Sequence, residues 1–313
     1  MLWGIINQKI RMVYHKPVLL QEVVKGLNVC STGVYIDLTF GGGGHSREIL
    51  KKLTNGKLYA FDQDLMAQKN NIESKNFKLI HANFRSFRKF LRMENVQKVD
   101  GVLADLGVSS YQINNSKRGF SFRLNSKLDM RMNIRGDQNA YDIINRHSQE
   151  ELQDIFYFYG ELPIAKQIAR VIVKSRVKKD IITTQDLVDV VIPFAKKNKS
   201  NQFLAKVFQA IRIAVNDEME CLKEMLLQTT EILKDRGRLV VISYHSLEDR
   251  LVKNLIKHGN TEGEQEKDFY GNIKKSFKQI NKKIIIPKIE EIKENSRSRS
   301  AKLRIAERIY NES

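Results

Sequence analysis

A run of four glycines at residues 41–44 constrains the fold of this chain more than any other feature. It follows segment 34–38, which reads as a short buried strand, and it leads into helix-compatible sequence that begins near His45. A glycine-rich turn between a strand and a helix is typical of parallel α/β sheets, and it lets a ligand approach the backbone closely. The sequence therefore predicts an α/β fold with a nucleotide-like ligand at this turn.

Further strand-like segments follow along the chain, each preceded by helix-compatible sequence. They lie at residues 57–62, near 77–81 and at 99–105. This alternation predicts a mostly parallel, doubly wound sheet. Strand character returns at 238–243 after a turn at 235–237, and segments 282–287 and 301–309 read as two strands that close the sheet edge.

Helical periodicity replaces the strand pattern between residues 113 and 212. Ser148 and Thr183, each followed three residues later by an acidic residue, read as helix starts. We therefore expect an all-helical insertion that recognises the substrate. The expected organisation is a first part of the α/β core at 1–112, the insertion at 113–212 and a second part of the core at 213–313. Met12 is an alternative start, which would make residues 1–11 an N-terminal extension.

The composition bears on the partner and the compartment. The chain has 313 residues, with 54 Lys and Arg against 36 Asp and Glu, and a formal net charge of +18. Such a charge favours a nucleic acid as partner, with a biased preference for Lys, Ile and Asn as the alternative explanation. No apolar stretch approaches the roughly 20 residues of a membrane helix, so the sequence predicts a soluble protein without a membrane partner. Cys30 and Cys221 are too few for a disulfide framework, fit a reducing cytoplasm and read as small buried residues.

Residues at the ends of the predicted strands indicate which ligand binds. A dinucleotide-binding turn would place its third glycine at Ser46 or Arg47, so a nicotinamide cofactor is the weaker interpretation. Asp62 ends the second strand, where a carboxylate can accept both hydroxyls of a ribose. Phe84, just after the third strand, offers an apolar face for adenine or is an ordinary core residue. The polar segment 105–112 follows the fourth strand, at the sheet edge where ligands of α/β proteins bind.

Together these segments closely resemble the bacterial family of 16S rRNA cytosine-N4 methyltransferases, also called ribosomal RNA small subunit methyltransferase H. The resemblance covers nearly the whole chain and rests on motifs at residues 15–20, 41–45, 105–110, 118–122, 128–132, 208–218, 243–250 and 295–304. The sequence departs from the family pattern at Tyr111, where proline is common, and before Phe208, where a His-Pro pair is missing. These departures bear on loop shape and substrate contacts and leave the cofactor residues intact.

The resemblance implies a Rossmann-like class I methyltransferase core with S-adenosylmethionine as cofactor. It also implies methyl transfer to N4 of a specific cytidine near the decoding region. The implied partner is 16S rRNA, within the small ribosomal subunit in the cytoplasm, and a homodimer stays open. The family's cofactor contacts carry over to Gly43, Gly44, His45, Asp62, Phe84, Asp105 and Gln112.

Methyl transfer from a sulfonium centre needs the acceptor nitrogen, the methyl carbon and the sulfur in line. Positioning and electrostatics can therefore supply most of the catalysis, and we expect neither a covalent enzyme intermediate nor a metal ion. Because the N4 lone pair is delocalised into the ring, an acceptor must orient the amino group and take its proton. Asp105, Ser109 and His245 are the candidates, and His245 fits equally well as a strand-end histidine satisfied by the backbone.

Five further motif residues are candidates for contacts with RNA phosphates or with a displaced target base. They are Arg118, Arg131, Arg212, Asn216 and Arg250. For each arginine alone, a salt bridge on the protein surface is an equally good interpretation. The Arg/Ser run at 297–300 predicts an ordered loop that faces RNA. The rival functions are an amino-methyltransferase with another nucleic-acid target and a ribosome-assembly factor whose cofactor pocket is vestigial.

Overall fold

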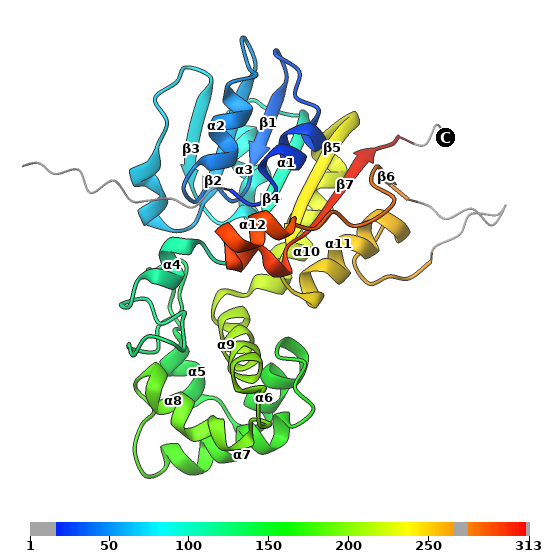
Figure 1. Ribbon diagram of the computed structural model, residues 1–313. Helices are drawn as coiled ribbons and strands as arrows, with labels where there is room; N and C mark the ends of the chain where they lie inside the picture. The colour runs from blue at the N-terminus through cyan, green and yellow to red at the C-terminus, as the bar shows by residue number, and fades with distance from the viewer. Residues whose placement is uncertain (1–16, 266–274, 311–313) are drawn as a thin grey trace, which may run out of the picture.

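The fold is organised around one seven-stranded sheet. The computed structural model describes residues 17–265 and 275–310, so the predicted extension at 1–11 and the start of the first motif lie outside the described residues. The strands are β1 Val34–Asp37, β2 Lys57–Asp62, β3 Phe77–His81, β4 Val99–Asp105, β5 Leu233–Ser243, β6 Phe277–Gln279 and β7 Lys302–Arg308. Their order is β3-β2-β1-β4-β5-β7-β6, and β1 to β5 run parallel while β7 runs antiparallel to both neighbours. The prediction of a mostly parallel, Rossmann-like sheet is confirmed (Figure 1).

Helices cover both faces of this sheet, because successive strand side chains point to opposite sides. Ile36 and Val102 pack with α3, α10 and α11 in one hydrophobic cluster, whereas their neighbours Tyr35 and Leu103 pack with α1 and α2 in another. The helices concerned are α1 Leu20–Leu27, α2 Gly44–Leu50, α3 Phe87–Met93, α10 Glu218–Ile232 and α11 Ser246–His258. Burial on both faces explains why the strands read as nearly continuous apolar runs.

A separate group of helices lies beyond one end of the sheet (Figure 1). It consists of α5 Ala140–Arg146, α6 Gln149–Asp154, a π-helical turn η3 Ile155–Tyr159, α7 Ala165–Arg176, α8 Thr184–Val191, the short turn η4 Ile192–Phe194 and α9 Ser200–Asn216. These helices share their own hydrophobic core, whose buried members run from Leu128 to Ile211. Capping boxes at Ser148 and Thr183 confirm the two helix starts expected there.

Short elements join these parts around the carboxyl edge of the sheet. They are the turns η1 Leu65–Asn70, η2 Phe84–Ser86 and η5 Ser296–Ser300, with the short helices α4 Ser110–Asn114 and α12 Ile289–Glu294. Among the described residues, no helix has both the length and the apolar character that a membrane span needs.

The strand predicted at 282–287 is wrong. Only Ile285 forms an isolated bridge, with Leu303, and the edge strand β6 lies earlier, at Phe277–Gln279. The side chain of Asn281 explains the difference, because it accepts a hydrogen bond from the Ile305 N–H and donates one to the Leu303 carbonyl. These backbone groups of β7 would otherwise pair with a regular strand.

Two further expectations need correction. The turn predicted at 235–237 lies inside β5, where Arg236 adopts a φ of 59° and the register against β4 shifts, so this strand starts at Leu233. Cys221 is buried as predicted, but the prediction for Cys30 is wrong, because this residue is exposed. Cys30 occupies a tight turn after α1, in which its carbonyl accepts from the Gly33 N–H.

Candidate active site

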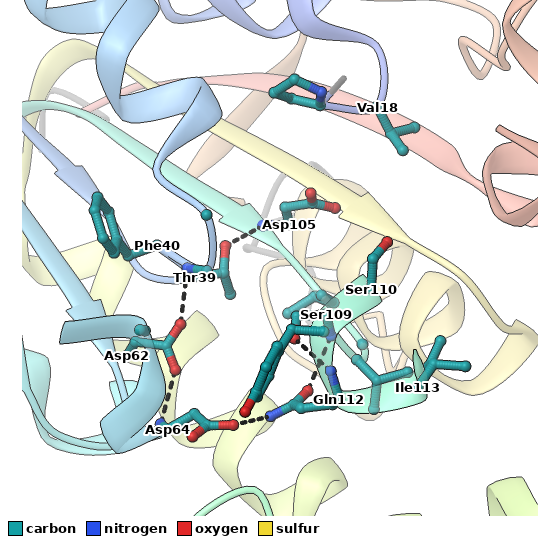
Figure 2. Close-up of a pocket in the computed structure, with 18 of the residues that line it drawn as sticks. Val18, Thr39, Phe40, Asp62, Asp64, Asp105, Ser109, Ser110, Gln112 and Ile113 are labelled. Atoms are coloured by element: carbon teal, nitrogen blue, oxygen red, sulfur yellow. Dashed lines mark hydrogen bonds between the residues drawn. The ribbon is translucent and has the colours of Figure 1, made fainter. Parts of the chain in front are cut away.

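A cavity of about 570 Å³ opens at the carboxyl ends of β1, β2 and β4 (Figure 2). Its walls are the glycine turn, the start of η2, the helix α4 and the turn η5. Six of the seven cofactor residues carried over by the resemblance line it, and Gly43 does not. Those six are Gly44, His45, Asp62, Phe84, Asp105 and Gln112.

The glycine turn brings backbone close to this cavity because side chains are excluded there. Gly43 has a φ of 73°, in the left-handed region that disfavours other residues, and a Cβ at this position would lie 2.7 Å from the Phe40 ring. A Cβ at Gly44 would lie 2.1 Å from Cγ of Pro17. Asp37 fixes the start of the turn, since its buried carboxylate accepts hydrogen bonds from the Ser46 hydroxyl and the Thr39 N–H. The turn therefore needs glycine for packing as well as for ligand access.

Asp62 lies beside the glycine turn at the end of β2 (Figure 2). Its Oδ2 accepts from the Gly41 N–H at 2.8 Å and its Oδ1 accepts from the Asp64 N–H at 2.8 Å. Desolvation raises the pKa of Asp62 to about 6. A carboxylate oxygen can accept two hydrogen bonds, and each oxygen of Asp62 accepts one of those described above. Asp62 therefore keeps the capacity to accept hydrogen bonds from a ligand in the cavity.

Asp105 lies at the end of β4 and lines the same cavity. Its Oδ1 accepts a 2.8 Å hydrogen bond from the hydroxyl of Tyr244, and its Oδ2 lies 3.8 Å from Nδ1 of His45. The Asp105 N–H donates to the Thr39 hydroxyl at 2.6 Å, which ties β4 to the glycine turn. Desolvation raises the pKa of Asp105 to about 6. Desolvation is thus the largest influence on the pKa of both carboxyls in the site.

Tyr244 is the functional candidate that the sequence analysis missed. It directly follows β5, lines the cavity and donates to Asp105, and burial together with the Asp105 charge raises the pKa of its hydroxyl well above the ordinary value. The hydroxyl therefore stays protonated and acts as a donor. A signal was available, because Tyr244 lies in the motif at 243–250, immediately before the histidine that drew attention.

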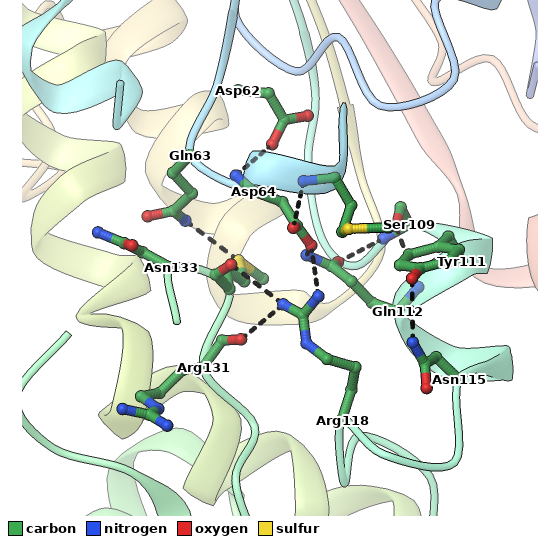
Figure 3. Close-up of polar contacts among 12 residues, drawn as sticks. Asp62, Gln63, Asp64, Ser109, Tyr111, Gln112, Asn115, Arg118, Arg131 and Asn133 are labelled. Carbon is green, nitrogen blue, oxygen red and sulfur yellow. Dashed lines mark hydrogen bonds and ion pairs between the residues drawn. The ribbon is translucent and has the colours of Figure 1, made fainter. Parts of the chain in front are cut away.

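Ser109 and Gln112 form the capping box of α4. The Ser109 hydroxyl accepts from the Gln112 N–H, and Gln112 Oε1 accepts from the Ser109 N–H. Gln112 also donates to Oδ2 of Asp64, which forms a 2.9 Å ion pair with the buried guanidinium of Arg118 (Figure 3). This network fixes the wall of the cavity that lies opposite the glycine turn.

Phe84 and His245, two other predicted site residues, differ in their placement. Phe84 opens η2, is partly buried against the core of the sheet and lines the cavity. His245 does not line it and caps α11 instead, where its Nδ1 accepts from the Glu248 N–H and its Nε2 lies 3.2 Å from Oε1 of Glu248. The structure therefore brings Asp105 and Ser109 together at the cavity and leaves His245 outside it.

The four arginines predicted to contact RNA all have carboxylate partners within the chain. The partners are Asp64 for Arg118, Asp129 for Arg131, Glu218 for Arg212 and Glu161 for Arg250. Asn216 is likewise engaged, since it accepts from the Met132 N–H and donates to the Met130 carbonyl. Of these five candidates, only Arg212 lines the cavity.

One group of described residues has the donor types for a cation. Ligand atoms of Glu218, His245 and Glu248 lie within 4.8 Å of one another. Arg212 donates to both carboxylate oxygens of Glu218, at 2.8 Å each, so a guanidinium already supplies positive charge to this group.

A model of the MraW methylase family matches residues 12–309. The chain belongs to the MraW methylase family. Two proteins similar to this chain are named ribosomal RNA small subunit methyltransferase H. That of Parabacteroides distasonis is 53% identical over 95% of this chain and 98% of its own length, and that of Christiangramia forsetii is 55% identical over 96% and 99%.

Solved structures are more distant from this MraW methylase family member. A putative methyltransferase from Streptococcus mutans in complex with SAH has a TM-score of 0.41 and 13% identity, and the match covers 93% of this chain and 97% of that one. The rRNA methylase from Streptococcus thermophilus has a TM-score of 0.38 and 12% identity, over 93% and 92%.

Proposed function

We propose that this protein transfers a methyl group from S-adenosylmethionine to N4 of a specific cytidine near the decoding region of 16S rRNA. The relatives' shared name, ribosomal RNA small subunit methyltransferase H, supports the class of substrate. The observation that carries the proposal is the cavity itself, in which Asp62 and Asp105 flank the glycine turn.

The residues of the cavity fit S-adenosylmethionine chemically. This molecule supplies an electrophilic methyl group on a positively charged sulfur, together with a ribose, an adenine and an amino-acid moiety. Asp62 has acceptor capacity for ribose hydroxyls, and Phe84 offers an apolar surface for adenine. The raised pKa of Asp105 and of Asp62 indicates that positive charge or additional donors in the cavity would stabilise both carboxylates.

The chain's own contribution to the reaction is positioning and charge stabilisation. Asp105 accepts a hydrogen bond from the amino group of the target base, stabilises the positive charge that develops on N4 and accepts the proton that N4 releases, while the Tyr244 hydroxyl fixes the orientation of Asp105. Ser109, whose oxygen accepts from the Gln112 N–H, keeps its own hydroxyl proton for donation into the cavity. Neither Cys30 nor Cys221 lines this cavity, in agreement with in-line displacement without a covalent enzyme intermediate.

The assembled small subunit in the cytoplasm is the proposed setting, and the helical part at 113–212 is the proposed substrate-recognition domain. Its helices lie beyond the end of the sheet at which α4 is found, and the loop between α4 and α5 leads from the core to them (Figure 1). A homodimer remains part of the proposal, and a measurement of the protein's molecular mass in solution tests it.

The decisive experiment follows label from S-adenosylmethionine into RNA. Purified protein is incubated with labelled cofactor and either small subunits or naked 16S rRNA from cells that lack the endogenous enzyme, and labelled nucleosides are then identified. We expect N4-methylcytidine with the wild type and none with Asp105→Ala. Label on another nucleoside would retain the methyltransferase and replace the target. Absence of both label and cofactor binding would favour a ribosome-assembly factor.

A further inference from the structure

Arg297 and Arg299, which belong to the run expected to face RNA, differ from the four paired arginines of the other motifs, and so does Arg123 of the loop after α4. Arg123, Arg297 and Arg299 have no carboxylate within ion-pair distance among the residues that the structure describes. Arg118 and Arg212, by contrast, are paired with Asp64 and Glu218. A guanidinium that is already paired with a carboxylate has little charge left for a polyanion, whereas an uncompensated one attracts phosphate strongly.

The position of these arginines follows from the packing of η5 on α4. Arg297 donates to Oδ1 of Asn114 at 2.6 Å and to the Ser110 carbonyl at 3.5 Å, so neutral acceptors hold its guanidinium in place. Ser298 is fully buried and bonds the Asn295 carbonyl, which anchors the turn between the two arginines. Arg297 and the exposed Arg299 both line the cavity.

Arg123 brings a third positive charge from a distant part of the sequence. It is exposed in the loop that links α4 to the helical part, with its guanidinium 5.9 Å from the centre of the Phe122 ring. Partial burial and the positive charge of Arg123 both lower the pKa of Arg297. Bringing like charges together without a counter-charge costs free energy, and a bound anion would remove that cost.

We propose that Arg123, Arg297 and Arg299 form a phosphate clamp that holds the RNA backbone on either side of the nucleotide entering the cavity. Arg297 and Arg299 line the cavity and Arg123 lies in the loop after α4, so phosphates held by the first two would leave the attached base free to be displaced toward Asp105. The identity of the polyanion as RNA rests on the proposed function, but the anion site itself rests on the three guanidinium groups.

Equilibrium binding of the full chain to a labelled single-stranded 16S rRNA fragment, measured over a range of salt concentrations, tests this clamp. The variants are Arg123→Ala, Arg299→Ala and the double variant that combines these two changes. Arg297 is replaced by lysine and not by alanine, because loss of the Arg297 contacts would disturb η5. We expect each alanine to reduce the slope of log affinity against log salt by about 0.7 and to weaken binding roughly fivefold at 0.1 M salt. The double variant should lose about twice the slope, while its thermal midpoint stays at the wild-type value.

The matched control is Arg92→Ala, which removes an equally exposed positive charge from α3, away from the residues that line the cavity. A slope loss in the control equal to that of Arg299→Ala would overturn the clamp in favour of diffuse attraction, and so would an unchanged slope in the double variant. The wild type alone decides the proposed function, because the nucleoside it methylates is read independently of these variants. The clamp and the reaction can therefore fail separately.

Discussion

Replacement of Tyr244 by phenylalanine removes a single hydroxyl and tests how the cavity keeps Asp105 ionised. The hydroxyl donates to Oδ1 of Asp105 at 2.8 Å, and this bond opposes the effect of desolvation, which has raised the pKa of that carboxyl to about 6. Hydrogen bonds to charged groups contribute about 1.5–3 kcal/mol, and one pH unit corresponds to about 1.4 kcal/mol. Loss of the bond should therefore raise the pKa of Asp105 further, by about one to two pH units.

The proposed reaction needs the ionised form of Asp105, so activity falls as the pH decreases through this pKa. In Tyr244→Phe the acid limb of the pH–rate profile should move to higher pH, with a large loss at pH 7 that recovers by about pH 9. Initial rates of methyl transfer from pH 5.5 to 9 measure the limb. Tyr111→Phe is the matched control, because Tyr111 also lines the cavity but its hydroxyl accepts from Asn115 instead of touching a carboxylate. Coincident acid limbs in wild type and Tyr244→Phe would refute the reasoning.

Three further predictions concern the proposed cofactor residues and the contacts that support them. Asp62→Ala should weaken the binding of S-adenosylhomocysteine (SAH) by about tenfold to a hundredfold in calorimetry, because the ribose loses its charged acceptor. An unchanged affinity would mean that Asp62 does not contact the ligand. Gly44→Ala should lower both thermal stability and SAH affinity, because its Cβ would fall 2.1 Å from Pro17 and overpacking of this kind costs about 1–3 kcal/mol. Arg118→Ala should lower the free energy of unfolding by roughly 3–5 kcal/mol in urea at pH 8, since it strands the buried carboxylate of Asp64. A loss under about 1 kcal/mol would mean that this ion pair is solvated.

The sequence predicts the sheet well where local pattern and global packing agree. β1, β2 and β4 are short apolar runs with glycine or polar residues at their ends, and burial on both faces of a parallel sheet produces that pattern directly. The segment at 282–287 has the same composition, but the side chain of Asn281 occupies the neighbouring strand's backbone groups. No local pattern reveals such a competitor, because it acts across the sheet.

The candidate site was predictable in its composition and not in its pairings. Asp62 and Asp105 were recognised because carboxylates at strand ends meet at one sheet edge. The partners of Arg118 and Arg250 were not, because each of these pairs joins the helical part to the core across a long stretch of sequence. Sequence identifies which charges exist, while the fold decides which of them are neutralised.

The position of β7 has a consequence for biosynthesis. This strand inserts between β5 and β6 and directly follows η5, so one continuous stretch near residue 300 supplies both an interior strand and a wall of the cavity. While a nascent chain is still too short to deliver β7, one side of β5 has unpaired backbone groups, and such an edge promotes association with other chains. Completion of the sheet and closure of the cavity are therefore one late event. If a ribosome stalls before this event, the released chain has neither a complete sheet nor a closed cavity.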